Sequence, residues 1–143
     1  MNWKEKTECP AVDEKILIPK DITSLFQKKK SSFTMVCAIQ GYGKTVSLAA
    51  MAQKKREEVL WYSLDSSDNQ VDLFCQRMFR LFMEKEVILS EIEKHREKFF
   101  SELLLFLKEG AKKQFLIFDN VQEIENEKIF QMILRMHKDC LLY

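Results

Sequence analysis

Short apolar runs alternate with amphipathic stretches along the chain. Residues 32–39 read SFTMVCAI, residues 59–64 read VLWYSL and residues 115–118 read FLIF. Short runs that are apolar at successive positions are typical of strands buried on both faces of a parallel sheet. We therefore predict three buried strands, and we interpret residues 140–143 (CLLY) as the start of a fourth.

The stretches between these runs have helical periodicity. Helices are predicted at residues 21–30, 46–55, 70–85, 90–108 and 126–138. We expect Asn69 and Asn126 to act as N-caps, Ser90 and Glu93 to form a capping box, and Gly110 to end a helix in a left-handed conformation. This order of strands and helices predicts an α/β fold with a parallel sheet and right-handed crossovers.

The two ends of the chain lead to a prediction about domains. Residues 1–14 are polar and contain Pro10, so we expect a flexible N-terminal segment. Residues 15–143 then form one domain. Because a domain rarely stops inside an apolar strand, we expect this domain to be incomplete at its C-terminus. A short edge strand at a genuine C-terminus is the alternative.

Composition narrows the possible functions. The 143 residues include 23 Lys plus Arg and 22 Asp plus Glu, a net charge of +1 that gives no support to nucleic-acid binding by bulk electrostatics. No apolar run approaches the ~20 residues that span a bilayer, so we expect no membrane contact. The chain lacks a signal-peptide pattern, and the four cysteines (Cys9, Cys37, Cys75 and Cys140) lack metal-site spacing. We therefore expect a cytoplasmic protein with reduced thiols.

Glycine is scarce, and its placement is informative. The chain has 3 glycines, where average usage of about 7% gives about 10, and Gly41 and Gly43 stand one residue apart after the first predicted strand. The window 38–45 reads AIQGYGKT, which matches the phosphate-loop pattern G-x-x-x-x-G-K-[ST] at every position except the first, Ala38.

This window has the chemistry of a phosphate site. The glycines allow backbone N–H groups to surround an anion, and the helix that follows points its positive N-terminus at the same place. Lys44 can reach the β- and γ-phosphates, and the Thr45 hydroxyl can bind Mg²⁺. The predicted nucleotide-binding residues are Gly41, Tyr42, Gly43, Lys44, Thr45 and Val46. The alternative is a tight strand-to-helix turn with a surface lysine.

A phosphate loop needs an acid for its metal ion. Asp119 follows the apolar strand at 115–118, at the strand end where ligands bind in open α/β sheets. We predict Asp119 as the catalytic acid and, with Thr45, as the metal ligand; a turn or cap aspartate is the alternative. Asn120 follows, where many ATPases of this layout have a second acid, and an amide cannot act as a general base.

Two other acids stand near the end of the second predicted strand. Asp65 and Asp68 leave the same edge of the sheet and could reach the nucleotide. We favour the reading that they form a turn and cap a helix. The charged stretch at residues 91–98 is interpreted as a solvated helix face.

Four segments together resemble a known family. They are KILIP (15–19), GYGKT (41–45), WYSLD-x-x-DNQ (61–70) and FLIFDN (115–120). They are similar to the N-terminal nucleotide-binding domain of MalT-like, LuxR-type transcriptional regulators, which belong to the signal-transduction ATPases with numerous domains (STAND). The resemblance covers residues 15–143 and implies a P-loop NTPase-like three-layer sandwich.

In that family, ATP binding and slow hydrolysis switch a resting monomer to a self-associated form. The resemblance implies ATP or ADP and Mg²⁺ as cofactors, with Lys44, Thr45 and Asp119 as their ligands. DNA is contacted only through a C-terminal helix-turn-helix domain, which these 143 residues do not include. Two alternatives remain open: a stand-alone P-loop ATPase or kinase, and a degenerate remnant that only associates with partners.

Overall fold

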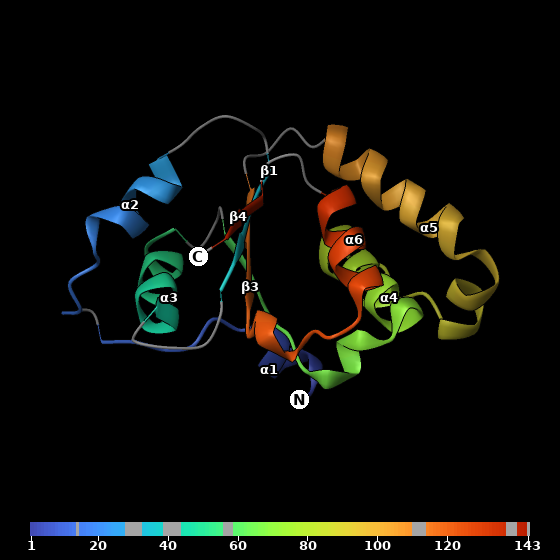
Figure 1. The fold of residues 1–143 in the computed structure, drawn as a ribbon, viewed down its shortest axis with the longest axis horizontal. Helices are drawn as coiled ribbons and strands as arrows, with labels where there is room; N and C mark the ends of the chain where they lie inside the picture. The colour runs from blue at the N-terminus through green and yellow to red at the C-terminus, as the bar shows by residue number, and fades with distance from the viewer. Residues whose placement is uncertain are drawn as a thin grey trace. The chain divides into compact units, whose positions relative to one another are not determined.

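A parallel β-sheet organises the chain. In the computed structural model, the strands within the described residues form one sheet in the order β2-β3-β1-β4, and each neighbouring pair is parallel (Figure 1). The strands are β1 (Phe33–Cys37), β2 (Val59–Ser63), β3 (Gln114–Asp119) and β4 (Cys140–Leu142). The structure describes residues 1–13, 15–27, 33–38, 44–55, 59–109, 114–136 and 140–142. The predicted α/β class with a parallel sheet is confirmed, as are the positions of the strands.

The two central strands are buried, as their apolar sequences predict. Met35 and Val36 of β1 pair with Leu116 and Ile117 of β3, and all four residues are shielded from solvent. Strands that bury successive residues need cover on both faces, which is why these segments lack an alternating polar pattern.

The chain divides into two units. The sheet unit comprises Met1–Leu64, Ala111–Glu123 and Asp139–Tyr143. The helical unit comprises Asp65–Gly110 and Ile124–Lys138. All four strands, and the candidate site described below, belong to the sheet unit.

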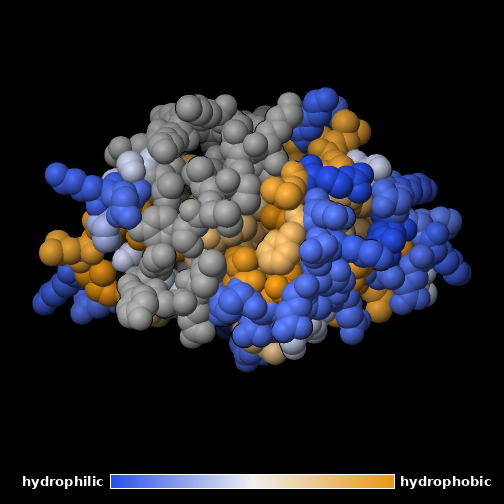
Figure 2. Space-filling model, viewed as in Figure 1, coloured by the Kyte–Doolittle hydropathy of each residue, from blue (hydrophilic) through white to orange (hydrophobic). Residues whose placement is uncertain are grey.

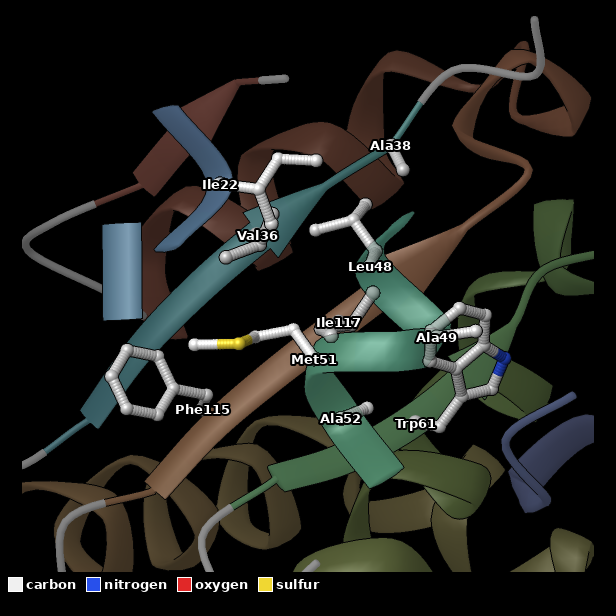
Figure 3. Close-up of a cluster of buried hydrophobic side chains, with 10 residues drawn as sticks. All are labelled: Ile22, Val36, Ala38, Leu48, Ala49, Met51, Ala52, Trp61, Phe115 and Ile117. Atoms are coloured by element: carbon white, nitrogen blue, oxygen red, sulfur yellow. The ribbon is translucent and has the colours of Figure 1, made fainter. Parts of the chain in front are cut away.

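Helices α2 and α3 account for the predicted helices at residues 21–30 and 46–55. The helical elements of the sheet unit are α1 (Trp3–Thr7), α2 (Lys20–Gln27), α3 (Lys44–Lys54) and the short 3₁₀ helix η2 (Val121–Glu123). Figure 3 shows the apolar side of α3 turned toward the strands. The core that they form contains Ile22, Val36, Ala38, Leu48, Ala49, Met51, Ala52, Trp61, Phe115 and Ile117.

The N-terminal segment contains a helix that its polar sequence did not predict. We expected a flexible segment over residues 1–14, and α1 forms within it. Asn2 Oδ1 accepts a hydrogen bond from the Glu5 N–H at 2.9 Å, and the Glu5 carboxylate accepts one from the Asn2 N–H at 3.3 Å. This reciprocal capping box satisfies two backbone donors at the start of the helix. A helix of five residues is too short to show apolar periodicity, so only its cap could have indicated it.

Within its described residues, the helical unit contains three α-helices and one short 3₁₀ helix. They are η1 (Ser66–Asn69), α4 (Val71–Met83), α5 (Leu89–Glu109) and α6 (Glu127–Met136). The apolar face predicted for α4 is buried and contains Phe74, Cys75, Met78, Phe79 and Phe82. The helices predicted at residues 70–85, 90–108 and 126–138 are therefore present, with ends that differ by a few residues.

Two of the predicted N-caps have different outcomes. Asn126 Oδ1 accepts the Lys128 N–H at 3.0 Å, so Asn126 caps α6 as predicted. The prediction that Asn69 caps α4 is wrong, because Gln70 occupies the cap position and provides no side-chain hydrogen bond. Asn69 Oδ1 instead accepts the backbone N–H groups of Glu125 and Asn126, at 2.7 and 3.0 Å.

Helix α5 differs from its prediction at its start and in its middle. It begins at Leu89, so Ser90 lies inside the helix and the predicted Ser90–Glu93 capping box is wrong. Its backbone is non-helical at His95, where φ is −134° and ψ is 36°. The charged stretch at residues 91–98 is largely exposed, apart from Ile92, and Figure 2 shows hydrophilic side chains gathered over this helix. The interpretation as a solvated face is confirmed.

Candidate functional site

Thr45 and Asp119 lie side by side at the carboxyl end of β3. Asp119 is the last residue of the strand, and Thr45 is the second residue of α3. The Thr45 Oγ1 hydroxyl donates a hydrogen bond to Asp119 Oδ1 at 3.1 Å. The sequence pairs these two residues as metal ligands, and the structure brings them together although 74 positions separate them.

The other predicted site residues are placed only in part. Gly41, Tyr42 and Gly43 lie outside the described residues, as does Gly110. Lys44 is the first residue of α3, so the helix N-terminus follows the glycine pair as predicted. The N-terminus of an α-helix carries unsatisfied N–H groups and a positive partial charge, which favour an anion.

The Asp119 carboxylate is buried in an environment that disfavours its charge. The residue is 5% exposed. Burial raises the pKa of Asp119 above its ordinary value of 3.8, while hydrogen bonds from the Thr45 hydroxyl and the Asn120 backbone N–H act in the opposite direction. No described side chain forms an ion pair with it. A cation bound beside Asp119 would offset the free-energy cost of burying its charged form.

Ala38, the position at which the window departs from the phosphate-loop pattern, lies in the core and not at the surface. Ala38 directly follows β1, and its side chain is fully buried in the core of the sheet unit (Figure 3). Its N–H donates to the Phe118 carbonyl at 2.8 Å, and its carbonyl accepts the Val121 N–H at 3.0 Å. The position therefore continues the sheet bonding of β1 and contributes a methyl group to the core.

Asn120 has an unusual backbone conformation beside the candidate acid. Its φ of 61° lies in the left-handed region, where Asn is tolerated better than most residues with a Cβ. In the sequence, Asn120 is notable as an amide at a position where many P-loop ATPases have an acid. An Asn directly after a buried strand is a turn signal, so this conformation could have been anticipated from the sequence.

The residues present fit a magnesium ion. A hydroxyl and a carboxylate are hard oxygen ligands, and Mg²⁺ is commonly held by one or two such groups together with water and substrate phosphates. Across the described residues, no three His, Cys, Asp or Glu side chains come together to hold a metal ion. The arrangement is therefore suited to a cation that arrives with a phosphate ligand, and not to one enclosed by protein.

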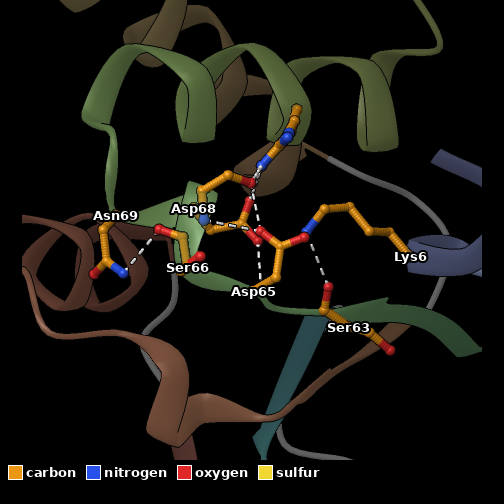
Figure 4. A network of polar contacts seen from close by, with 8 residues as sticks. Lys6, Ser63, Asp65, Ser66, Asp68 and Asn69 are labelled. Atoms are coloured by element: carbon orange, nitrogen blue, oxygen red, sulfur yellow. Dashed lines mark hydrogen bonds and ion pairs between the residues drawn. The ribbon is translucent and has the colours of Figure 1, made fainter. Parts of the chain in front are cut away.

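Asp65 and Asp68 serve the local structure of the helical unit, as we favoured. Asp65 Oδ1 accepts the Ser67 N–H at 2.9 Å, and Asp68 Oδ2 accepts the Asp65 N–H at 2.9 Å, which forms a capping box around η1 (Figure 4). The fully buried Asp68 also forms an ion pair with Arg77 at 2.7 Å. These contacts account for both carboxylates without a ligand.

A cleft of about 210 Å³ in the helical unit has different chemistry. It is lined partly by Arg96, Arg135 and Phe100. Arg96 pairs with Asp72 at 3.0 Å, and the Arg135 guanidinium lies 4.9 Å from the centre of the Phe100 ring. Both arginines already have partners, and the residues that line this cleft do not include Thr45 or Asp119.

Comparison with known protein families finds a match over most of the chain. A family model described as an AAA domain matches residues 27–142. The match includes the glycine pair, Thr45, Asp119 and all four strands, and it leaves α1 outside. No curated protein matches the chain. None of the helices within the described residues combines the length and apolar character needed to cross a bilayer.

Proposed function

The chain belongs to the AAA domain family, and from this premise we propose that it is an ATP- and Mg²⁺-binding switch domain. Domains of this P-loop class generally bind ATP or ADP with Mg²⁺. The observation that carries the proposal is the 3.1 Å hydrogen bond between Thr45 and Asp119, next to the helix N-terminus that follows the glycine pair.

Each site residue has a role in this proposal. The backbone N–H groups of residues 41–46, with the N-terminus of α3, hold the phosphates. Lys44 supplies positive charge to the β- and γ-phosphates, and Thr45 and Asp119 bind Mg²⁺. A bound ion would neutralise negative charge on the phosphates. ADP is an equally suitable occupant of such a site.

We propose binding with slow turnover at most. Asn120 stands where many P-loop ATPases have the acid that activates the attacking water. Its amide cannot accept a proton from that water. Asp119 remains the candidate catalytic acid, acting through the metal. The alternative is a stand-alone ATPase or kinase. The described residues offer no feature that favours this alternative over a switch domain.

The more specific proposal is a domain of a MalT-like, LuxR-type regulator of the STAND class. It rests on the resemblance of residues 15–19, 41–45, 61–70 and 115–120. In this proposal the domain is cytoplasmic, it contributes to self-association of a longer protein, and DNA contact belongs to a separate C-terminal domain. Residues 15–143 form the nucleotide-binding domain.

Titration with a fluorescent ATP or ADP analogue, with and without Mg²⁺, tests the proposal. Lys44→Ala should lower affinity by about tenfold or more, because a charge-assisted contact contributes about 1.5–3 kcal/mol. The matched control is Lys54→Ala, which removes an exposed lysine from the last turn of the same helix and should leave affinity unchanged.

The two variants separate a specific site from non-specific charge attraction. Equal losses in Lys44→Ala and Lys54→Ala would contradict the proposed site. Absence of Mg²⁺-dependent binding by the unmodified chain would overturn the proposed function itself.

A further inference from the structure

Helix α1 lies outside the segment matched by the AAA domain, yet it is docked in the sheet unit through a buried lysine. Lys6 is 1% exposed, and its Nζ donates a hydrogen bond to the Ser63 carbonyl at 3.2 Å (Figure 4). The same ammonium lies 5.0 Å from the centre of the Tyr62 ring. Trp3 packs edge-on against that ring, with 6.2 Å between ring centres.

The carbonyl held by Lys6 belongs to the residue beside the candidate acid. Ser63 is the last residue of β2, and it pairs in register with Asp119 of β3. The next residue, Leu64, donates its N–H to the Asp119 carbonyl at 2.9 Å. A continuous path of hydrogen bonds and backbone therefore runs from Lys6 through the end of β2 to Asp119.

Burying the Lys6 ammonium group costs free energy unless its charge makes favourable contacts. A buried cation loses hydration, and an apolar side chain of similar length would fill the same space without that loss. A carbonyl acceptor and an aromatic face are among the contacts that the ammonium makes. An apolar side chain could not donate a hydrogen bond to the Ser63 carbonyl at the end of β2.

We propose that Lys6 is a positioning residue for the Mg²⁺–nucleotide site, acting from α1 through the end of β2 on Asp119. The proposal rests on the proposed function of that site. Helix α1 then contributes to nucleotide binding, although it lies outside the residues that the family model matches. Loss of the hydrogen bond from Lys6 to the Ser63 carbonyl should increase the local mobility of the backbone at Leu64 and Asp119.

Lys6→Met tests this in the full chain, with Lys4→Met as the matched control because Lys4 is exposed on the same helix. Amide hydrogen exchange of the ligand-free protein is the first readout. We expect the Leu64 amide to exchange about tenfold faster in Lys6→Met, relative to the buried Leu48 amide of α3, with no change in Lys4→Met. Lys6→Arg keeps a cation and should restore most of the protection.

The Mg²⁺ requirement for binding a fluorescent ADP analogue is the second readout. We expect the half-saturating Mg²⁺ concentration to rise by about threefold or more in Lys6→Met. A purely structural role would accelerate exchange uniformly and leave the Mg²⁺ requirement unchanged, and that result would overturn the inference. If Lys6→Met does not fold, Trp3→Leu, which keeps the ammonium and removes a ring contact, gives the same two readouts.

These readouts separate this inference from the proposed function. If the unmodified chain binds no Mg²⁺–nucleotide, the proposed function fails, and so does this inference. If it binds and Lys6→Met changes neither readout, only the inference fails.

Discussion

The two units each bury an aspartate, and they treat it in opposite ways. Asp68 of the helical unit is fully buried, pairs with Arg77 at 2.7 Å and accepts the Asp65 N–H. Asp119 of the sheet unit is 5% exposed, and its contacts are a hydroxyl and a backbone N–H, with no ion pair to any described side chain. Asp68 therefore has a cation partner, whereas no side chain within the described residues supplies one to Asp119.

This difference distinguishes a structural acid from a candidate ligand-binding acid. A buried charge that is paired and hydrogen-bonded contributes to the fold and has little to offer a ligand. A desolvated carboxylate without a cation partner is costly in the ligand-free protein, and such groups are typical of functional sites. The comparison makes predictions that concern each aspartate and its surroundings.

The largest expected effect is the loss of the cation that pairs with Asp68. Arg77→Met removes the guanidinium that pairs with the fully buried Asp68 carboxylate, and we expect the free energy of unfolding to fall by about 3–5 kcal/mol. Urea unfolding measures the change. The control is Arg80→Met, whose pair with Glu86 is exposed and should contribute at most about 1 kcal/mol. Equal losses in the two variants would contradict a structural role for Asp68.

A smaller effect is expected from the backbone next to Asp119. Asn120→Val places a β-branched residue at a φ of 61° and should cost about 1–2 kcal/mol, while Asn120→Gly should not destabilise the chain. Glu84, with a φ of 55° at the end of α4, offers the matched test in the helical unit. Glu84→Gly should stabilise by up to about 1 kcal/mol in urea unfolding. If Asn120→Val is neutral, the left-handed conformation is not needed for the turn.

Removing the charge of Asp119 should stabilise the ligand-free protein slightly. Because the folded-state pKa of Asp119 is raised, folding is disfavoured by the carboxylate at neutral pH, and the wild type regains stability as the pH falls toward 3.8. Asp119→Asn should therefore raise Tm at pH 7, and this gain should shrink as the pH is lowered through that window. The same Asp119→Asn variant should lose Mg²⁺-dependent nucleotide binding.

The smallest effect concerns reactivity and leaves stability unchanged. Burial, with a smaller contribution from Asp72, raises the pKa of the Cys75 thiol from 9.0 to about 11. At pH 8 its thiolate fraction is then about a hundredfold lower than that of an ordinary thiol, so Cys75 should resist alkylation. Half-buried Cys9 of the sheet unit should react before Cys75, as peptide mapping by mass spectrometry can measure. Equal rates at both cysteines would mean that the core around Cys75 opens readily.

The sequence predicted the strands well because burial on both faces leaves a strong signal. The runs at residues 32–39, 59–64 and 115–118 correspond to β1, β2 and β3, and the parallel arrangement follows from them. The pairing of Thr45 with Asp119 was also accessible, because the glycine pair and the acid-terminated strand can be recognised separately and then placed at one sheet edge.

The details that the sequence did not reveal depend on contacts between distant residues. Asn69 appeared to be a helix cap, but it binds backbone groups at Glu125 and Asn126, and no local pattern reports such a contact. Likewise, Lys6 stands in a polar segment, and its burial depends on a carbonyl 57 positions away. Local propensity describes the start of a helix, whereas the choice among possible partners is made by the tertiary structure.

The strand order also has a consequence for synthesis of the chain on the ribosome. β1 is translated before the other strands, yet its partners are β3 and β4, at residues 114–119 and 140–142. The apolar segment of β1 therefore remains without its partner strands until residues 114–119 and 140–142 have been translated. Such a segment is prone to wrong pairing until its partners emerge, so folding of the sheet late in translation should be slow and should benefit from a chaperone.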